Sequence, residues 1–330
     1  MKLKRLASLL LCTVSILAIS IPSASAIESK NNNNSILLEM GIPYEIIEVI
    51  PNTDKIKLVE TYLSDPNAIK ISNSTLEIDV LSELNALVNA SDIKLLNSGY
   101  SQEQIRRSRA IINLYNNTSD EVLLQSGLSQ KELNDLRAAL DPSTDWSAYP
   151  KSMISTAKLT FTQTVTQPSA SNNNTEVNVS LYFNWISPYY TDQLTDKIVI
   201  SWGGNLKQTS LSERISYYDT ELFGTSFTDY LGRGNAYYSE TAINAMGIYE
   251  FEQSIDQIVP GKTGLVRMGA ITYRLNQNSY TGTASKVIAY YLHQRTTINA
   301  SIAFTGDSIT PSISFGTGYD HAYVEASIKY

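Results

Sequence analysis

The feature that most constrains this chain is the alternation of apolar and polar side chains that begins near residue 154 and continues to the C-terminus. Three of the alternating sets are Val177, Val179, Leu181, Phe183 and Trp185; Ile298, Ala300, Ile302 and Phe304; and Ala322, Val324, Ala326 and Ile328. Successive side chains of a strand point to opposite faces, so alternation places one face in a core and the other in water. We therefore expect residues 153–330 to form an antiparallel β-sandwich domain.

Residues 36–140 follow a helical period instead and contain an internal repeat. The motif occurs at 37–43, 95–101 and 123–129, with starts 58 and 28 residues apart. In each copy a Gly ends a helix and the next helix begins shortly after it. Ser129 and Glu132 have the spacing of a capping box. No copy is present around Pro66, so a middle unit is degenerate or absent. The pattern predicts a helical domain of helix–turn–helix repeats.

The chain thus divides into an N-terminal helical region and a β-sandwich-like domain, which together define an α+β fold. Residues 27–35 are polar and are expected to be a disordered lead-in, and 141–152 read as a linker. The linker contains Trp146 and Tyr149, which indicates that it docks against a neighbouring surface. The stretch 205–254 is less regular, and we expect long loops with a short helix near 239–246.

The first 26 residues have the three parts of a secretory signal peptide. Lys2, Lys4 and Arg5 precede an apolar run at 6–21, and Ala24 and Ala26 form a small-x-small cleavage site. That run is shorter than the roughly 20 residues of a membrane-spanning helix. We therefore expect a secreted protein, extracellular or cell-wall associated, with no permanent membrane span.

Removal of this leader changes the composition of the chain in two ways. Cys12 is the only cysteine, so the mature chain has no thiol for disulfides, catalysis or metal binding. The formal net charge falls from −7 to −10 with the loss of three basic residues. An acidic chain of this kind is not expected to bind nucleic acid, which requires basic patches.

Catalytic motifs are absent from the sequence, as are phosphate-binding glycine loops and calcium-binding loops. The two histidines, His293 and His321, are expected to be core or solvent residues, so we predict no metal site and no cofactor. Asp320 and His321 are adjacent strand residues and should face opposite sides. A carboxylate-dependent glycan hydrolase stays open as an alternative, because its two acids need only meet in space. The acids in or near the irregular segment are Glu213, Asp219, Glu221, Asp229, Glu240, Glu250 and Glu252.

Tyrosine is abundant, with 21 residues, and it forms four tandem pairs. On a strand, each pair sends one ring inward and one outward. Outward rings supply a rigid contact area with a hydroxyl group, which suits sugar or peptide binding, although tyrosine also favours strands for packing alone. The residues predicted to bind are Tyr189, Tyr190, Tyr217, Tyr218, Tyr237 and Tyr238.

A Thr-rich amphipathic ribbon spans residues 158–185, with a polar turn in its middle. Each arm has about ten residues, close to the length of a membrane-spanning strand. The ribbon is therefore either the stem of a β-pore-forming protein or a long edge hairpin of a sandwich.

The leading hypothesis is a secreted, non-enzymatic binding protein from a Gram-positive-type bacterium. Its partner would be cell-wall polysaccharide or a surface protein. A membrane-damaging protein and a glycan hydrolase are the alternatives.

Overall fold

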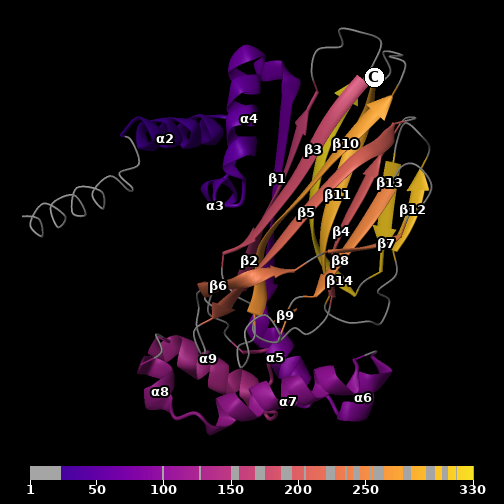
Figure 1. Cartoon of the computed structure of the whole chain (residues 1–330). Coiled ribbons are helices and arrows are strands. Elements are labelled where there is room, and N and C mark those ends of the chain that lie inside the picture. The colour runs from indigo at the N-terminus through magenta and orange to yellow at the C-terminus, as the bar shows by residue number, and fades with distance from the viewer. Residues whose placement is uncertain are drawn as a thin grey trace, which may run out of the picture.

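The computed structural model describes the chain from residue 24 to residue 329 with internal gaps. The gaps are 99, 126–127, 150–155, 168–174, 187–194, 204–205, 221–226, 235, 241–245, 253, 256–263, 278–283, 295–301, 307–310 and 317. The structure confirms an α+β fold in which helices precede a sandwich of antiparallel sheets (Figure 1).

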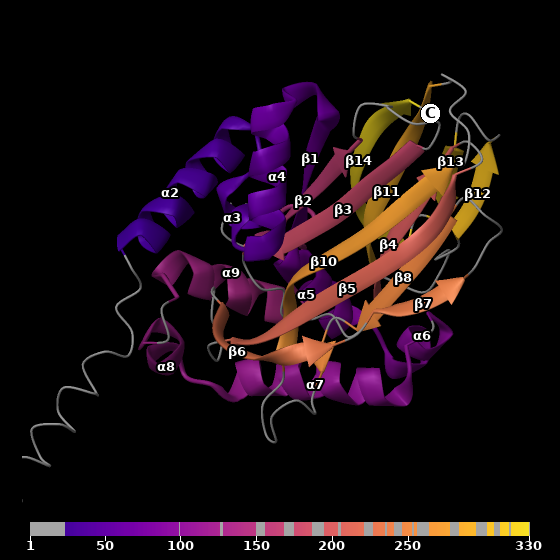
Figure 2. The same ribbon diagram turned by 45° about the horizontal axis from the view of Figure 1, so that its top comes forward.

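Helices form two groups on different sides of the sandwich (Figures 1 and 2). The first group is α2 (Ala24–Glu39), α3 (Tyr44–Ile47), α4 (Asn52–Ser64) and the 3-10 turn η1 (Pro66–Ala68). The second group is α5 (Val80–Asn89), α6 (Asp92–Asn97), α7 (Gln102–Asn117), α8 (Asp120–Gln125) and α9 (Gln130–Leu140). The first group covers one face of a sheet, and the second group lies across one end of the sandwich.

The larger sheet, here sheet A, has the order β1-β2-β3-β10-β5-β6, with β9 also paired to β10. Its strands are β1 (Ile69–Asp79), β2 (Thr156–Thr166), β3 (Thr175–Trp185), β5 (Lys207–Thr220), β6 (Phe227–Gly234), β9 (Ser254–Ile255) and β10 (Gly264–Gln277). The ribbon of β2 and β3 lies inside this sheet, because β1 pairs with β2 and β10 pairs with β3. It is therefore not an edge hairpin.

The second sheet, sheet B, has the order β14-β11-β4-β8-β7, and a two-stranded ribbon lies over its outer face. The strands of sheet B are β4 (Thr195–Trp202), β7 (Tyr237–Glu240), β8 (Met246–Glu252), β11 (Ala284–Gln294) and β14 (Tyr319–Lys329). The ribbon consists of β12 (Ile302–Gly306) and β13 (Pro311–Phe315). All of the strand pairs among the described residues are antiparallel, as the alternation predicts.

The main core fills the space between the two sheets. The inward side chains of β3 are completely buried there: Val177, Val179, Leu181, Phe183 and Trp185. Phe183 stacks on Phe251 of the opposite sheet with ring centroids 5.4 Å apart. Full burial of one such side chain contributes roughly 1.5–3 kcal/mol, so the interdigitated rings account for much of the stability of the sandwich.

The outer face of β2 and β3 differs from the expectation of a solvent-exposed flank. Tyr182 and Asn184 are 1 % and 2 % exposed. The reason is that α2–α4 cover this face and are tied to it through polar groups. Asn184 Nδ2 donates to Glu45 O at 2.7 Å, and Thr160 Oγ1 donates to the Glu45 carboxylate at 2.9 Å. Thr160 and Asn184 on this face therefore hydrogen-bond to the helical layer rather than to water.

Strand β1 lies within the range expected to be helical, 36–140, and is the main departure from that expectation. It pairs with β2 from Ile69↔Thr166 to Asp79↔Thr156. It also lies beside β14, where Ser74 and Ser72 hydroxyls accept from the backbone N–H of Tyr323 and Glu325, each at 3.3 Å. The strand occupies the place in the chain where a middle repeat unit is missing.

The three copies of the repeat share one backbone hydrogen bond. The backbone N–H of Ile42, Tyr100 and Leu128 donates to the carbonyl five residues earlier, at 3.0, 3.1 and 3.3 Å. Gly41 has the positive φ of 90° that such a turn requires. Ser129 and Glu132 form both hydrogen bonds of the expected capping box.

Arg109 and Arg137, which lie 28 residues apart, make equivalent sets of hydrogen bonds, and we call each set an arginine clamp. The repeat therefore includes these arginines as well as the Gly turn. Arg109 donates to Leu87 O, Ala90 O and Asp92. Arg137 donates in the same way to Tyr115 O at 2.7 Å, Thr118 O at 2.6 Å and Asp120 at 2.7 Å. Each guanidinium thus fixes the last carbonyls of the preceding long helix.

The Arg137→Ala variant is expected to lose about 1.5–3 kcal/mol of unfolding free energy, since hydrogen bonds to a charged group are lost at once. Arg137→Lys should recover only part of this, because an ammonium lacks the planar fork. Chemical denaturation checks both, with Lys131→Ala on the same helix as the control. Equal stability of the Ala and Lys variants would contradict the clamp.

The segment after α9 docks on the helical bundle, as Trp146 and Tyr149 predict. Their rings stack 5.2 Å apart at 6°, and Trp146 is 8 % exposed within the core of α5–α9. Tyr149 OH also donates to Asp135 Oδ1 at 3.1 Å. The segment is therefore a packed connection.

Two further sequence expectations differ from the structure. Residues 27–35 belong to α2 rather than to a disordered lead-in, because the helix continues into the fully buried Leu37. Ser239 and Glu240 lie in β7, and Met246 begins β8, where a helix was expected; 241–245 are outside the described residues. Register shifts interrupt the period of two in this part of the chain, between Tyr238 and Glu240 in the β7–β8 pair and around Tyr218 in the β5–β6 pair.

Ala24 and Ala26, the predicted cleavage residues, open α2, and residues 1–23 are outside the described part of the chain. Within the described part, no helix combines the length and the apolar character needed to cross a bilayer.

Candidate functional site

Of the tandem tyrosines chosen from the sequence, the structure describes the side chains of Tyr217 and Tyr218, and these two face opposite sides of sheet A. Tyr217 is 1 % exposed in the main core and is thereby removed from any contact surface. Tyr218 points to the opposite face, where its ring contacts Tyr230 and the Arg267 guanidinium. Tyr237 and Tyr238 lie on β7 opposite Glu250 and Tyr249, with side chains outside the described ones, and Tyr189 and Tyr190 lie in an undescribed gap.

A different group of rings gathers on the outer face of sheet B, and we call it the aromatic patch. Its members are Tyr290 of β11, Phe315 of β13, and His321 and Tyr323 of β14. The ring centroids of Tyr290 and Tyr323 are 4.7 Å apart, as are those of Phe315 and His321. Tyr290 also meets Phe315 at 5.1 Å and His321 at 5.8 Å, so the four rings are continuous.

Strand register places these rings on one face. Tyr290 and Tyr323 are direct partners in the β11–β14 ladder, and His321 is two residues from Tyr323 on the same strand. Their neighbours Tyr291 and Ala322 point the other way and are fully buried. The ribbon of β12 and β13 covers the adjacent part of the sheet through Ile313 and ends beside the patch at Phe315. Tyr323 and His321 remain exposed.

A charged pair borders the patch and sets its hydrogen-bonding character. Tyr323 OH donates to Glu325, and Lys286 Nζ lies 3.1 Å from Glu325 Oε1. Burial raises the pKa of Tyr323, and the hydrogen bond to Glu325 raises it further. The same hydrogen bond, followed by that from Lys286, lowers the pKa of Glu325. At neutral pH the patch therefore presents a neutral phenol beside a carboxylate acceptor and an ammonium donor.

The sequence contained part of this signal. Tyr290–Tyr291 is one of the four tandem pairs, although it is not among the six residues predicted to bind. The exposed face of β14 carries His321, Tyr323 and Glu325 at alternate positions. Only the pairing of β11 with β14 shows that these positions share a surface with Tyr290.

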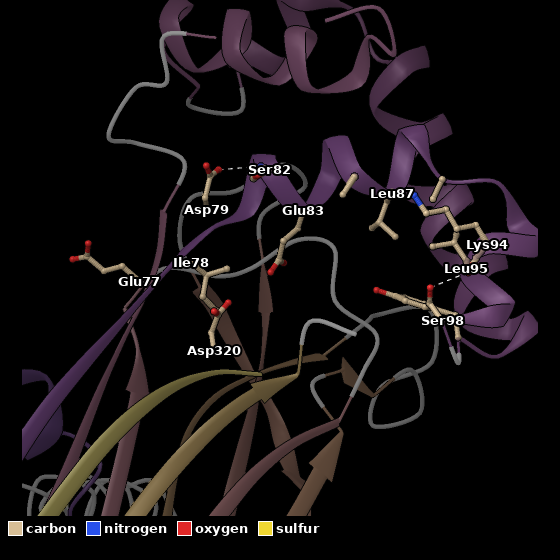
Figure 3. A pocket seen from close by; sticks show the side chains of 13 residues that line it. Glu77, Ile78, Asp79, Ser82, Glu83, Leu87, Lys94, Leu95, Ser98 and Asp320 are labelled. Atoms are coloured by element: carbon tan, nitrogen blue, oxygen red, sulfur yellow. Dashed lines mark hydrogen bonds between the residues drawn. The ribbon is translucent and has the colours of Figure 1, made fainter. Parts of the chain in front are cut away.

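An acidic cleft lies where the helical bundle meets the end of the sandwich (Figure 3). Its volume is about 640 Å³, and its charged lining consists of Glu77, Asp79, Glu83, Lys94 and Asp320. Figure 3 shows the Glu83 and Asp320 carboxylates entering the space from α5 and from β14. Pockets at the junction of two structural units are common binding positions.

The charges of this cleft suit a positively charged group. Four carboxylates and one ammonium belong to its lining, and apolar side chains such as Leu87 and Leu95 complete the wall. Asp79 also has a structural role, because its carboxylate accepts from Ser82 N at 2.9 Å and caps α5. Among the described residues, no cluster of three or more His, Cys, Asp or Glu side chains could hold a metal ion.

The two histidines occupy different environments. His293 is fully buried, and its Nδ1 lies 3.0 Å from Asp196 Oδ1. His321 is exposed in the aromatic patch, whereas Asp320 lines the acidic cleft. Asp320 and His321 thus face different sites, in agreement with their adjacent positions on a strand.

Glu213 of β5 is one of the acids noted in the sequence, and burial raises its pKa. A raised pKa in the folded state contributes stability at low pH, and this contribution is lost as the pH rises through the folded pKa. The unfolding free energy of Glu213→Gln should therefore equal that of the wild type below the ordinary glutamate pKa of about 4.3 and should be higher than that of the wild type at neutral pH. Screening of this partly exposed group limits the gain to about half a kcal/mol.

Denaturation curves across this pH range measure the effect, with Glu60→Gln on the exposed side of α4 as the charge control. A gain from Glu213→Gln at low pH only would contradict the sign of the shift.

The geometry defines the chain as an α+β protein with an antiparallel β-sandwich and an exposed aromatic patch. No family model and no curated protein sequence matches it. Among solved structures, one similarity is to AvmM, described as catalysing macrocyclization in alchivemycin A biosynthesis. It has 10 % sequence identity and a TM-score of 0.17, and the match covers 47 % of this chain and 80 % of that chain. A likeness at this TM-score carries no argument about function.

Proposed function

We propose that this chain is a secreted, non-enzymatic binding protein that attaches to polysaccharide of the cell wall through the aromatic patch. The observation that carries the proposal is the continuity of four rings on one open sheet face. Flat aromatic faces provide rigid apolar area against the C–H face of a sugar ring. Lys286 and Glu325 at the border supply a donor and an acceptor for sugar hydroxyls.

The predicted leader supports an extracellular location, and the net charge supports a neutral polymer as the ligand. A secretory signal places the mature chain where polysaccharide is accessible. The acidic composition of the mature chain favours a neutral polymer over an anionic one, because like charges repel at the approach.

Retention on insoluble cell-wall polysaccharide tests the proposal. The His321→Ala, Tyr323→Ala double variant removes the two exposed rings and should weaken retention about tenfold, which corresponds to about 1.4 kcal/mol. Tyr44→Ala is the matched control, because Tyr44 is 64 % exposed on α3 and distant in the fold from the patch. Equal retention of the double variant and the wild type would overturn the proposal.

The two alternatives make different predictions. A carboxylate-dependent hydrolase would turn over a glycan panel and lose turnover on a single Asp or Glu substitution. A pore-forming protein would release dye from liposomes only when residues 158–185 are intact. That role requires the β2–β3 ribbon to leave its pairs with β1 and β10.

A further inference from the structure

A second cleft lies between α4 and the outer face of sheet A. Figure 1 shows α4 on the side of the sandwich away from the β12–β13 ribbon, which lies over the face of sheet B that carries the aromatic patch. Its volume is about 700 Å³, within the range of roughly 300–1,000 Å³ of small-molecule sites. Lys57 and Thr61 line it from α4, and Thr164, Ser180, Thr272 and Arg274 line it from strands β2, β3 and β10.

The floor of this cleft departs from the usual packing of a helix on a sheet. Such contacts normally bury apolar side chains on both layers. One part of the α4 contact obeys this rule, since Leu58 and Val59 belong to the same buried cluster as Met268 and Ala270. Around Thr164, Ser180 and Thr272 the sheet face is instead polar, and the helix stands away from it as the wall of the cleft.

Hydroxyl groups form a connected set on this floor. Thr272 Oγ1 donates to Ser180 Oγ at 3.1 Å. Tyr182 is 1 % exposed, and burial raises its pKa to about 12, while hydrogen bonds with Ser180 and Thr164 act in the opposite direction. Thr164 is 2 % exposed. These groups are neutral at physiological pH, and each hydroxyl both donates and accepts.

The charges at the rim select the class of ligand. Asp54, Asp65, Lys57 and Arg274 line the rim, and Arg274 is already paired with Glu176, with Nε 3.3 Å from Oε1. A net charge on the ligand would therefore add little to the binding free energy. Several hydroxyl groups on a small ring would instead find matching hydrogen-bond donors and acceptors in the cleft. A buried polar group in a complex must keep its hydrogen bonds, which favours a polyhydroxylated ligand over an apolar one.

We propose that the cleft beneath α4 is a binding site for a small neutral saccharide, separate from the aromatic patch. The two sites share no residue and lie on the outer faces of different sheets. A chain with both sites could hold a polymer on one side and a short saccharide on the other. The second site stands on its own geometry and does not need the patch to function.

Saturation-transfer NMR with N-acetylglucosamine, galactose and maltose as probes tests this site. The measurements use the His321→Ala, Tyr323→Ala chain, which lacks the exposed rings of the aromatic patch. Any saccharide binding that is observed can then be assigned to the cleft, whether or not the patch binds polysaccharide. At least one probe is expected to bind. The added changes Ser180→Ala and Thr272→Val should weaken it about fivefold, because they remove hydroxyls with little change of shape. Ser312→Ala on β13 is the control.

Three results would overturn the proposal. One is that none of the three probes binds the patch variant. Another is that binding is equal with and without Ser180→Ala and Thr272→Val. The last is that glucuronate binds better than the neutral sugars. Thermal unfolding of each variant shows that a loss of signal reflects the cleft rather than the fold.

Discussion

Replacement of Asp196 by alanine is expected to lower the unfolding free energy by about 3–5 kcal/mol, the cost of removing one partner from a buried polar network. Asp196 is completely buried on β4. Its carboxylate lies 3.0 Å from His293 Nδ1 and accepts from Tyr291 OH, which in turn accepts from Trp185 Nε1 at 3.1 Å. The variant removes the acceptor that joins strands β4 and β11 in the core.

Urea denaturation followed by circular dichroism measures this loss. Glu60→Ala, on the exposed side of α4, is the control and should change stability by less than about 0.5 kcal/mol, as surface substitutions do. A loss below about 1 kcal/mol for Asp196→Ala would show that the network contributes little.

Gly269→Ala is the second substitution expected to disturb the sandwich strongly. Gly269 lies on β10 directly opposite Phe183 of β3. An added Cβ would lie 2.4 Å from the Phe183 ring and 2.8 Å from Ile215 Cδ1, closer than these atoms can approach. The ring is held by Phe251 and Tyr291, so it cannot move away freely. Overpacking of this kind costs about 1–3 kcal/mol.

A double-mutant cycle with Phe183→Leu separates a clash from other effects. The smaller side chain makes room, so Gly269→Ala should cost less in the Phe183→Leu background. Gly41→Ala provides a contrast, because its Cβ would meet no atom within 4 Å and its cost comes from φ alone. Additive effects of Gly269→Ala and Phe183→Leu would contradict the packing account.

The strands with regular alternation could be predicted because one side of each faces the single main core. β3 and β14 belong to this class. β1 was not predicted, and the reason is physical. Its Ser72 and Ser74 hydroxyls accept hydrogen bonds from the backbone of β14 instead of facing solvent. The strands between 205 and 254 were not predicted because bulges interrupt the period.

The helical repeat shows the opposite case, in which sequence reasoning is strong. The 28-residue spacing is local, and a Gly turn with its cap needs no distant partner. The equivalent roles of Arg109 and Arg137 follow from the same spacing, but their acceptors are main-chain carbonyls that have no sequence signature.

The candidate site was the least predictable part. Tandem tyrosines indicate strands with rings on both sides, but they do not say which outward rings meet. Tyr290 gains its partners from β13 and β14, which follow it along the chain. The clefts likewise form between elements far apart in sequence, such as α4 and β10.

Side-chain resonances of the two histidines give the most direct test of the aromatic patch as the polysaccharide surface. The chain has only two histidines, one exposed in the patch and one enclosed in the core. In a titration with polysaccharide, the signals of the buried His293 therefore serve as an internal reference for those of His321. Soluble fragments of the wall polymer should shift the ring signals of His321 and leave those of His293 in place. Unchanged His321 signals on a chain that retains the polymer would place the contact elsewhere and contradict the account.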